Sequence, residues 1–518
     1  SMSLIEKLQN PMLYDHPIEQ FEVIETHISW VLLTGDYVYK IKKPVNFGFL
    51  DFSTLEKRRF YCHEEVRLNR RLAPQLYLGV IAIHGSEAHP ELDGQGPVIE
   101  YAVKMRQFPQ SMQLDRMLAQ QGLDNLLMDK LASKVAQFHL SIEPVDKHTD
   151  FGDIQHIQVP MLENFEQIRP VIHDKKIIAE LDKLESWTFR QLEVLAITIQ
   201  QRKAEGFVRA CHGDMHLKNI ALWNNEIIIF DCIEFNENLY WIDVISEIAF
   251  LLMDLEDRQQ YALAQRFLNH YLEITGDYQG LKLFRFYKVY RAMVRTKVNA
   301  LRLQQEQAGT QAYQQTFDGL LAYLVLAKTY IQPTSPCLLI NHGLSGAGKS
   351  VGTCLLLEKY PAIQVRSDVE RKRLYQVLPD TEITEAARQL IYSAEATRRT
   401  YARLVDIARC LLDAGYPVVI DAANLKLQQR QLFYELARSM QVPYFILAYQ
   451  APVEALRQRI KQRTELGADV SDATLETLEH QLTSYEPLSE KEKRFSIEIA
   501  SDGHMDIDAI IEQLSAAA

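Results

Sequence analysis

The sequence predicts a multidomain chain in which an α+β domain precedes an α/β domain, and three observations support this. The chain has 518 residues, enough for two to four domains with ample cores. Its first part mixes short alternating apolar runs with long helical stretches. A proline-marked connector at 331–336 precedes an apolar run, a glycine-rich loop and a helix, which together begin a parallel sheet. We therefore expect one domain over residues 2–330 and a second over 335–518.

Residues 211–231, CHGDMHLKNIALWNNEIIIFD, carry the first chemical motif. Asp214 follows a His-Gly pair, Asn219 comes five residues later, and a short apolar run then leads to Asp231. Phosphoryl transfer needs a carboxylate at the attacking hydroxyl, which is the role expected of Asp214. It also needs oxygen ligands for the Mg²⁺ that bridges the phosphates of ATP, and we assign these to Asn219 and Asp231.

This His-Gly-Asp motif resembles the aminoglycoside phosphotransferase and choline kinase branch of the protein-kinase-like fold. The resemblance implies a two-lobed domain in which Asp214 is the catalytic base and Asn219 and Asp231 hold magnesium. Two departures from protein kinases favour the small-molecule branch: no glycine-rich loop precedes Lys40, and Asp-Cys-Ile stands at 231–233. We interpret His212 and Asp243 as structural residues, and for His216, which could be either a ligand or a structural residue, we prefer the structural role.

The segments 28–33 and 37–45 flank a Thr-Gly-Asp turn and predict a β-hairpin. Strand alternation places Val38, Lys40 and Lys42 on one face of its second strand. In the N-terminal lobe of a kinase, one inward lysine on such a strand holds the α- and β-phosphates of ATP. We assign this role to Lys40, with Lys42 as the alternative.

Residues 54–72 predict a charged amphipathic helix. In the resembling family this helix carries a glutamate that pairs with the strand lysine. Glu65 lies seven residues before Leu72, as in the pattern of that family, and Glu64 is its competitor.

The resemblance also assigns the remaining segments of the first domain. Residues 98–108 alternate like a strand, and we place the adenine-binding hinge at 101–105. A helix over 124–140 precedes the catalytic motif. In the family, a helical region such as 244–330 forms the acceptor pocket; its helices are predicted at 256–274, 281–306 and 311–329.

A second nucleotide motif follows the connector. Gly343-x₄-Gly348-Lys349-Ser350 is a Walker A loop that lies between an apolar strand at 337–340 and a helix that starts at Lys349. Its backbone N–H groups can surround the phosphates of ATP or GTP, Lys349 reaches the β- and γ-phosphates, and Ser350 holds Mg²⁺. The residues expected to bind nucleotide here are Gly343, Ser345, Gly346, Ala347, Gly348, Lys349, Ser350 and Val351.

The spacing of four polar residues after the Walker A loop is typical of a small P-loop kinase. Asp368 and Asp421 each stand at the end of an apolar strand, and Arg459 and Arg463 share one helix face. This region resembles the polynucleotide kinase, gluconate kinase and zeta-toxin branch. The resemblance implies that Asp368 activates the acceptor hydroxyl and that the two arginines stabilise charge on the transferred phosphate. Asp421 is interpreted as a metal-organising residue or a substrate contact.

Composition limits the functional class. The net charge of −12 excludes a general nucleic-acid coat protein but permits a local basic groove. No apolar run reaches membrane-spanning length, no signal peptide is visible, and the six cysteines are scattered without a C-x-x-C pair. We expect a cytoplasmic protein without a membrane partner, and the sequence does not determine its oligomeric state.

Together these motifs predict a bifunctional ATP-dependent kinase that transfers the γ-phosphate to a hydroxyl group on a small molecule or a nucleic-acid end. The overall pairing resembles bacterial fusion proteins that combine these two kinase types. Two alternatives stay open: one active kinase joined to a nucleotide-sensing regulatory domain, and a non-catalytic ATP-dependent scaffold or toxin-like regulator.

Overall fold

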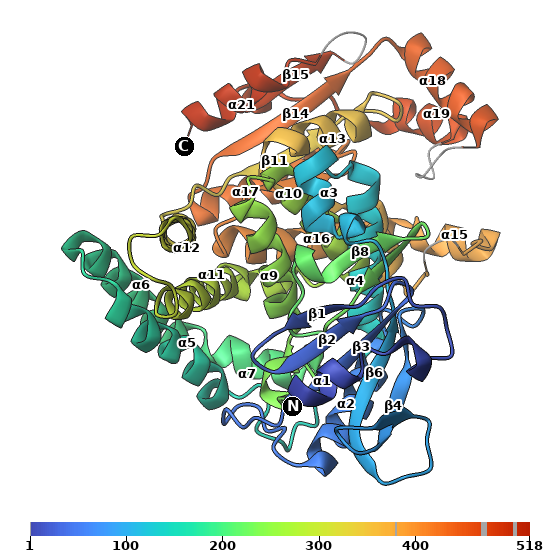
Figure 1. Ribbon diagram of the computed structural model, residues 1–518. Helices are drawn as coiled ribbons and strands as arrows, with labels where there is room; N and C mark the ends of the chain where they lie inside the picture. The colour runs from blue at the N-terminus through green and yellow to red at the C-terminus, as the bar shows by residue number, and fades with distance from the viewer. Residues whose placement is uncertain (1, 379–380, 468–473, 501–504, 518) are drawn as a thin grey trace. The chain divides into compact units, whose positions relative to one another are not determined.

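A computed structural model describes residues 2–378, 381–467, 474–500 and 505–517, which form two compact units (Figure 1). Unit 1 comprises Ser1–Gln259 and Leu283–Ile331, and unit 2 comprises Gln260–Lys282 and Gln332–Ala518. The predicted fold class is confirmed, because unit 1 combines an antiparallel sheet with a helical lobe and unit 2 is built on a parallel sheet.

The first lobe of unit 1 is a six-stranded antiparallel sheet with the order β1-β2-β3-β6-β4-β5. The predicted hairpin is the β2–β3 pair, and α2 packs against β4 and β6. Tyr39 and Ile41 pack with α1 on one face of the sheet, while Val38 belongs to the core on the other face, which α2 shares. The elements are α1 (Met2–Lys7), β1 (Glu22–Glu25), β2 (Ser29–Leu33), β3 (Tyr37–Lys42), α2 (Leu55–Asn69), β4 (Tyr77–Gly85), β5 (Pro90–Leu92) and β6 (Val98–Arg106).

The predicted position of the hinge is wrong. Residues 101–105 lie within β6, where the backbone pairs with β3 on one side and with β4 on the other. Because the backbone N–H and C=O groups of this strand already form hydrogen bonds with the two neighbouring strands, they cannot also bind adenine. The strand ends at Arg106, so the connection between the lobes starts at Gln107.

The second lobe of unit 1 is mostly helical. It contains two short antiparallel pairs, β7 with β10 and β8 with β9, and the helix α9 is buried along nearly its whole length. The elements of this lobe are α3 (Leu114–Gln121), α4 (Asn125–Ser141), α5 (Ile154–Ile168), α6 (Lys175–Val194), α7 (Ala196–Ala204), β7 (Val208–Ala210), η4 (Leu217–Asn219), β8 (Ile220–Trp223), β9 (Glu226–Ile229), α8 (Glu237–Tyr240), β10 (Trp241–Asp243), α9 (Val244–Asp257), α11 (Leu281–Leu303) and α12 (Gln311–Tyr330).

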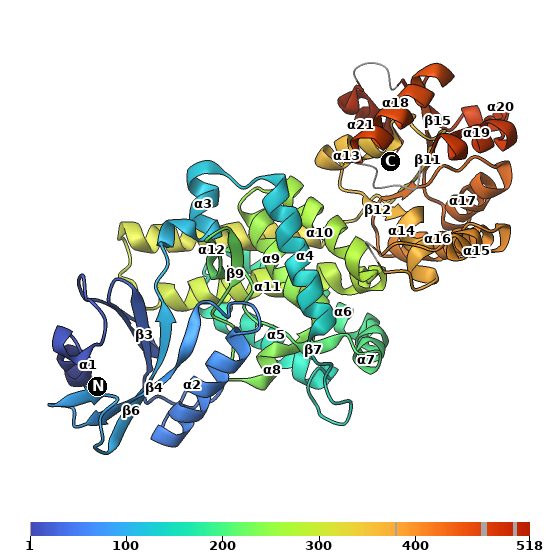
Figure 2. The ribbon, with the colours of Figure 1, turned by 90° about the vertical axis from the view of Figure 1, so that its right-hand side faces the viewer.

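Unit 2 contains a five-stranded parallel sheet with the order β12-β13-β11-β14-β15. Figure 2 labels β11, β12 and β15 of this sheet. Both faces are buried: Leu339 and Val419 pack with α13, α18 and α21, and α16 and α17 pack against the sheet as well. Its elements are β11 (Leu338–His342), α13 (Lys349–Lys359), β12 (Ile363–Arg366), α14 (Ser367–Leu374), α15 (Glu385–Ile391), α16 (Ala394–Asp413), β13 (Val418–Asp421), α17 (Leu427–Met440), β14 (Tyr444–Gln450), α18 (Val453–Leu466), α19 (Leu475–Ser484), α20 (Glu490–Lys493), β15 (Ser496–Ala500) and α21 (Ile507–Ala516).

The single helix predicted over 256–274 is divided in two. α9 ends at Asp257, Gln259 takes a left-handed φ of 64°, and α10 (Tyr261–Thr275) then begins. α10 and the short helix η5 (Tyr278–Gly280) pack with α13, β12 and α16 and therefore belong to unit 2, whereas the sequence prediction placed them with the first domain. None of the described helices is both long and apolar enough to cross a bilayer.

Candidate active sites

The N-terminal lobe brings Lys40, Glu65 and Asp231 together. The Lys40 Nζ on β3 lies 3.2 Å from Glu65 Oε2 on α2 and 3.4 Å from Asp231 Oδ1. Burial opposes the charge of Lys40, but Asp231 and Glu65 outweigh it and hold the pKa of the amine well above its usual value. The competitor Glu64 instead pairs with Arg67 at the protein surface. The geometry therefore favours Glu65 as the partner of the strand lysine.

Lys42, the alternative to Lys40, lies in the same cluster. Its Nζ is 2.7 Å from Glu65 Oε1 and 2.8 Å from Glu234 Oε1, and the side chain is only 3% exposed. Burial raises the pKa of Glu65, but the two lysines outweigh this and lower it to about 2. Sequence reasoning missed Glu234, which stands three residues after Asp231; that proximity was the one available signal.

The catalytic motif folds as a tight loop around Asp214. The Asn219 amide nitrogen donates to Asp214 Oδ2 at 3.0 Å, and His216 Nε2 lies 3.4 Å from the same oxygen. Burial acts to raise the pKa of Asp214, but the hydrogen bond and charge of His216 bring it below the ordinary value. The side chain is 39% exposed, so this charged carboxylate is accessible from solvent.

Glu247 supports the loop that carries Asp214 through hydrogen bonds to the loop backbone. Sequence reasoning missed this residue. It is fully buried on α9, and its carboxylate accepts hydrogen bonds from Gly213 N at 2.7 Å and from His212 N at 3.1 Å. His139 Nε2 lies 2.8 Å from Glu247 Oε2. Burial raises the pKa of Glu247, but His139 and the other hydrogen bonds lower it to about 2. A lone acidic residue in the apolar run VISEIAF was the available signal.

Gly213 of the His-Gly-Asp motif is required because its surroundings leave no room for a side chain. Gly213 has a φ of 93°, and a Cβ at this position would lie 2.9 Å from the Leu239 carbonyl oxygen. His212 Nε2 lies 2.7 Å from the Phe230 carbonyl oxygen, which ties the loop to the strand end before Asp231. These contacts agree with the interpretation of His212 as structural.

Asp231 and Asn219 lie at the same end of the β8–β9 pair, where Phe230 N donates to the Asn219 carbonyl oxygen at 2.9 Å. Asp231 takes a left-handed φ of 54°, and Tyr77 fixes it by donating to Oδ1 at 3.2 Å and accepting from the Asp231 N–H at 3.0 Å. The amide nitrogen of Asn219 is used within the loop, so its amide oxygen is the atom it can offer to a cation. A carboxylate and an amide oxygen form a donor set that fits Mg²⁺.

Asp243 has a structural role, as interpreted from the sequence. Its two oxygens accept hydrogen bonds from Arg202 at 2.7 and 2.9 Å, and Oδ1 also accepts from Ile245 N at the start of α9. This buried pair anchors the N-terminus of the helix that carries Glu247.

The predicted Walker A loop joins β11 to α13 in unit 2. Gly346 and Gly348 have φ values of 83° and 92°, and a Cβ on Gly343 would lie 2.9 Å from the Tyr449 carbonyl oxygen. The Lys349 amine donates to the carbonyl oxygens of Gly343 at 2.7 Å and Leu344 at 3.0 Å. Burial lowers the pKa of Lys349 to about 8, although Asp421 and Asp368 act to raise it.

The other polar residues of this site lie at the carboxyl-terminal ends of the parallel strands. Asp421 ends β13, and it accepts from Asn341 Nδ2 at 3.1 Å and from Gln364 Nε2 at 2.9 Å. Within the described chain, the buried Oδ1 of Asn341 has no hydrogen-bond partner, and a hydrated cation beside Asp421 would satisfy it. Asp368 lies in the first turn of α14, and Ser350 lies exposed in the first turn of α13. Hydroxyl and carboxylate oxygens at these strand ends fit Mg²⁺.

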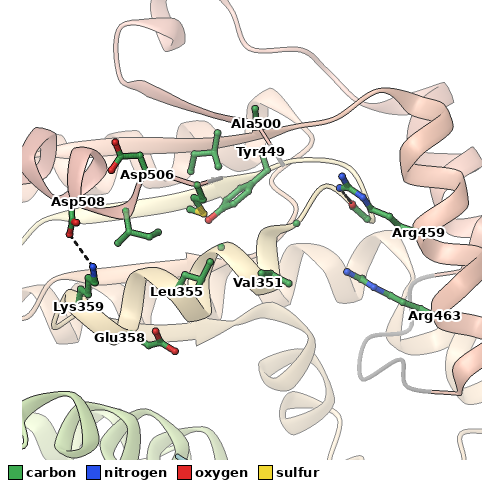
Figure 3. A pocket seen from close by; sticks show the side chains of 16 residues that line it. Val351, Leu355, Glu358, Lys359, Tyr449, Arg459, Arg463, Ala500, Asp506 and Asp508 are labelled. Carbon is green, nitrogen blue, oxygen red and sulfur yellow. Dashed lines mark hydrogen bonds and ion pairs between the residues drawn. The ribbon is translucent and has the colours of Figure 1, made fainter. Parts of the chain in front are cut away.

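A cavity of about 600 Å³ lies beside the Walker A loop (Figure 3). Gly348 is among its lining residues, Val351 and Tyr449 line it on different sides, and Arg459 and Arg463 reach it from α18. Arg459 Nη1 donates to the Gly346 carbonyl oxygen at 3.0 Å. Arg459 therefore contacts the loop that would bind phosphate, and Arg463 lines the cavity beside it. Ser345 lies in the same loop, and its N–H donates to Gln481 Oε1 of α19 at 2.9 Å.

Two family models match separate parts of the chain. A phosphotransferase enzyme family matches residues 48–284, and an AAA domain family matches residues 338–488. An uncharacterized protein of Mycobacterium tuberculosis is 30% identical over 466 residues, which cover 89% of this chain and 90% of the relative.

Two solved structures resemble single parts of the chain. Amicoumacin kinase in complex with AMP-PNP, Ca²⁺ and Ami has a TM-score of 0.38 at 14% identity, covering 64% of this chain and 93% of that one. The APS kinase of Mycobacterium tuberculosis has a TM-score of 0.27 at 19% identity, covering 35% of this chain and 99% of that one.

Proposed function

Because the chain belongs to the same family as its Mycobacterium tuberculosis relative and is a phosphotransferase with two kinase-type parts, we propose that both parts are active ATP-dependent kinases. Each would transfer the γ-phosphate to a hydroxyl group. The observation that supports this most directly is that each unit brings polar residues of its motif together: the Asn219 amide donates to Asp214 Oδ2 in unit 1, and Asp421 acts electrostatically on Lys349 in unit 2.

In the first site, Asp214 would accept the proton of the attacking hydroxyl. Its lowered pKa keeps it ionised at neutral pH, and its exposure lets an acceptor approach. Lys40, held by Glu65, would bind the α- and β-phosphates of ATP. Asn219 and Asp231 would hold Mg²⁺, which neutralises phosphate charge when it is bound.

In the second site, Lys349 and the backbone N–H groups of the 343–350 loop would bind the phosphates of ATP or GTP. Asp368 would accept the proton of the acceptor hydroxyl, and Arg459 and Arg463 would stabilise charge on the transferred group. Ser350 and Asp421 would hold Mg²⁺ here, where it again neutralises phosphate charge.

The acceptor is a small molecule with a hydroxyl group or the hydroxyl end of a nucleic acid. The test is a screen of both classes with γ-labelled ATP and Mg²⁺, using the Asp214→Asn/Lys349→Ala double variant as the blank. We expect label to appear in a phosphate ester with the wild-type chain and not with the double variant. Label transfer that is equal in the two proteins would contradict the proposal.

A further inference from the structure

Residues 260–282 lie within the stretch that the phosphotransferase family matches, yet they pack with the parallel sheet of unit 2. β12 is an edge strand of that sheet, and α10 covers it. Gln265 and Asn269 donate to the Ala362 carbonyl oxygen at 2.8 and 3.1 Å, and Gln364 N donates to Asn269 Oδ1 at 2.9 Å. These side chains satisfy backbone groups that an edge strand leaves open.

The same helix supplies a carboxylate next to the second candidate site. Arg366, the last residue of β12, places Nη1 2.6 Å from Glu273 Oε1 on α10. Its Nε lies 3.9 Å from Asp421 Oδ2, because the parallel register puts Arg366 beside Asp421. One guanidinium therefore stands between two carboxylates, and the closer one belongs to Glu273.

Glu273 and its neighbours also hold the helix that carries Asp368. Arg373 on α14 donates to the Glu273 carbonyl oxygen and to the fully buried Glu370. Tyr278 of η5 donates to Glu370 Oε2 at 3.4 Å. A Cβ on Gly276 would lie 2.8 Å from Arg373 Nε, so the backbone at Gly276 packs closely against the Arg373 side chain.

We propose that Glu273 is a positioning residue of the second site: it holds the guanidinium of Arg366 away from Asp421 and so keeps that carboxylate available to magnesium-bound nucleotide. The inference rests on the proposed role of Asp421. When Glu273 loses its charge, the Asp421 carboxylate, 3.9 Å from Nε, is left beside Arg366. An ion pair there competes directly with the cation for the same oxygen atoms.

The test measures binding in the full-length chain and needs no acceptor. A fluorescent ATP analogue is titrated with Mg²⁺, and the signal that Lys349→Ala removes is assigned to the second site. We expect Glu273→Gln to raise the Mg²⁺ concentration needed for half-maximal binding at this site about fivefold, the size typical of a partly exposed ion pair. Glu395→Gln, which removes an exposed glutamate paired with Arg398, serves as the matched control and should leave the value unchanged.

A double-mutant cycle separates this effect from loss of structure. In an Arg366→Gln background, adding Glu273→Gln should change the Mg²⁺ requirement by less than twofold. Arg366→Gln alone should lower the requirement, because it removes a cation beside Asp421. The proposal is overturned if Glu273→Gln leaves the requirement unchanged, if it acts equally in both backgrounds, or if Arg366→Gln raises the requirement.

The proposed function and this inference fail in different ways. If no acceptor is phosphorylated but the Mg²⁺ titration follows the expected cycle, the transfer activity is wrong and the role of Glu273 stands. If Lys349→Ala removes no nucleotide binding, both are wrong.

Discussion

Lys42 lies closer to Glu65 than Lys40 does, at 2.7 Å against 3.2 Å. Glu65 therefore has two partners with different surroundings. Lys42 is enclosed between Glu65 and Glu234 and is 3% exposed, whereas Lys40 is 21% exposed and also approaches Asp231. We infer that Lys42 fixes the position of Glu65, and that Lys40 is the lysine that can reach a nucleotide.

The first prediction separates these two roles. Lys42→Met leaves Glu65 and Glu234 buried without their shared cation, so we expect it to lower the free energy of unfolding by about 3–5 kcal/mol. Lys40→Met should cost much less stability but should remove nucleotide binding at the first site. Chemical denaturation and titration with a fluorescent ATP analogue measure the two effects. Lys57→Met, at an exposed ion pair with Asp51, is the control and should change neither quantity appreciably.

The second prediction concerns the glycine of the catalytic loop. Gly213→Ala places a Cβ 2.9 Å from the Leu239 carbonyl oxygen in a left-handed conformation, so the loop must shift and carry Asp214 with it. We expect turnover at the first site to fall at least 100-fold, measured as acceptor-dependent ADP release in a Lys349→Ala background. Gly122→Ala shares a positive φ but meets open space, so turnover should persist there. Equal losses in the two variants would show that the clash at Gly213 is not the cause.

The third prediction is a dependence of stability on pH. The pKa of Glu247 is about 2 in the folded protein, below its ordinary value of 4.5, so its contribution is complete above pH 4.5 and is lost as pH falls toward 2. This shift corresponds to about 3 kcal/mol. Glu247→Gln should therefore lower the free energy of unfolding at pH 7 and flatten its decline between pH 4.5 and 2, as measured by denaturant titration across this range. Glu193→Gln, an exposed position on α6, should leave the pH profile as steep as in the wild type.

Local patterns were sufficient to predict the elements that carry the chemistry. Period-2 alternation placed Lys40 and Lys42 on one face of a strand, and the glycine spacing of 343–348 identified a loop between β11 and α13. Asp421 at a strand end followed from a short apolar run before it. In each case the residues that form the sequence pattern lie within about ten positions of the element that the pattern predicts.

The features that sequence reasoning missed depend on contacts between distant segments. Glu247 supports a loop that lies more than thirty residues earlier in the chain, and Glu234 matters because β3 brings Lys42 to it. The hinge was misplaced because alternation shows that a strand exists but not which neighbours occupy its backbone groups. Similarly, the helical pattern of 261–275 does not indicate that this segment packs on β12.

The most direct test of two independent kinase sites is ATP turnover by Asp214→Asn and Lys349→Ala variants, each measured with every acceptor that the wild-type chain phosphorylates. We predict that Asp214→Asn abolishes transfer to one acceptor and preserves transfer to another, and that Lys349→Ala does the reverse. If one variant abolishes all transfer and the other changes none, a single kinase with a regulatory partner domain would replace this account.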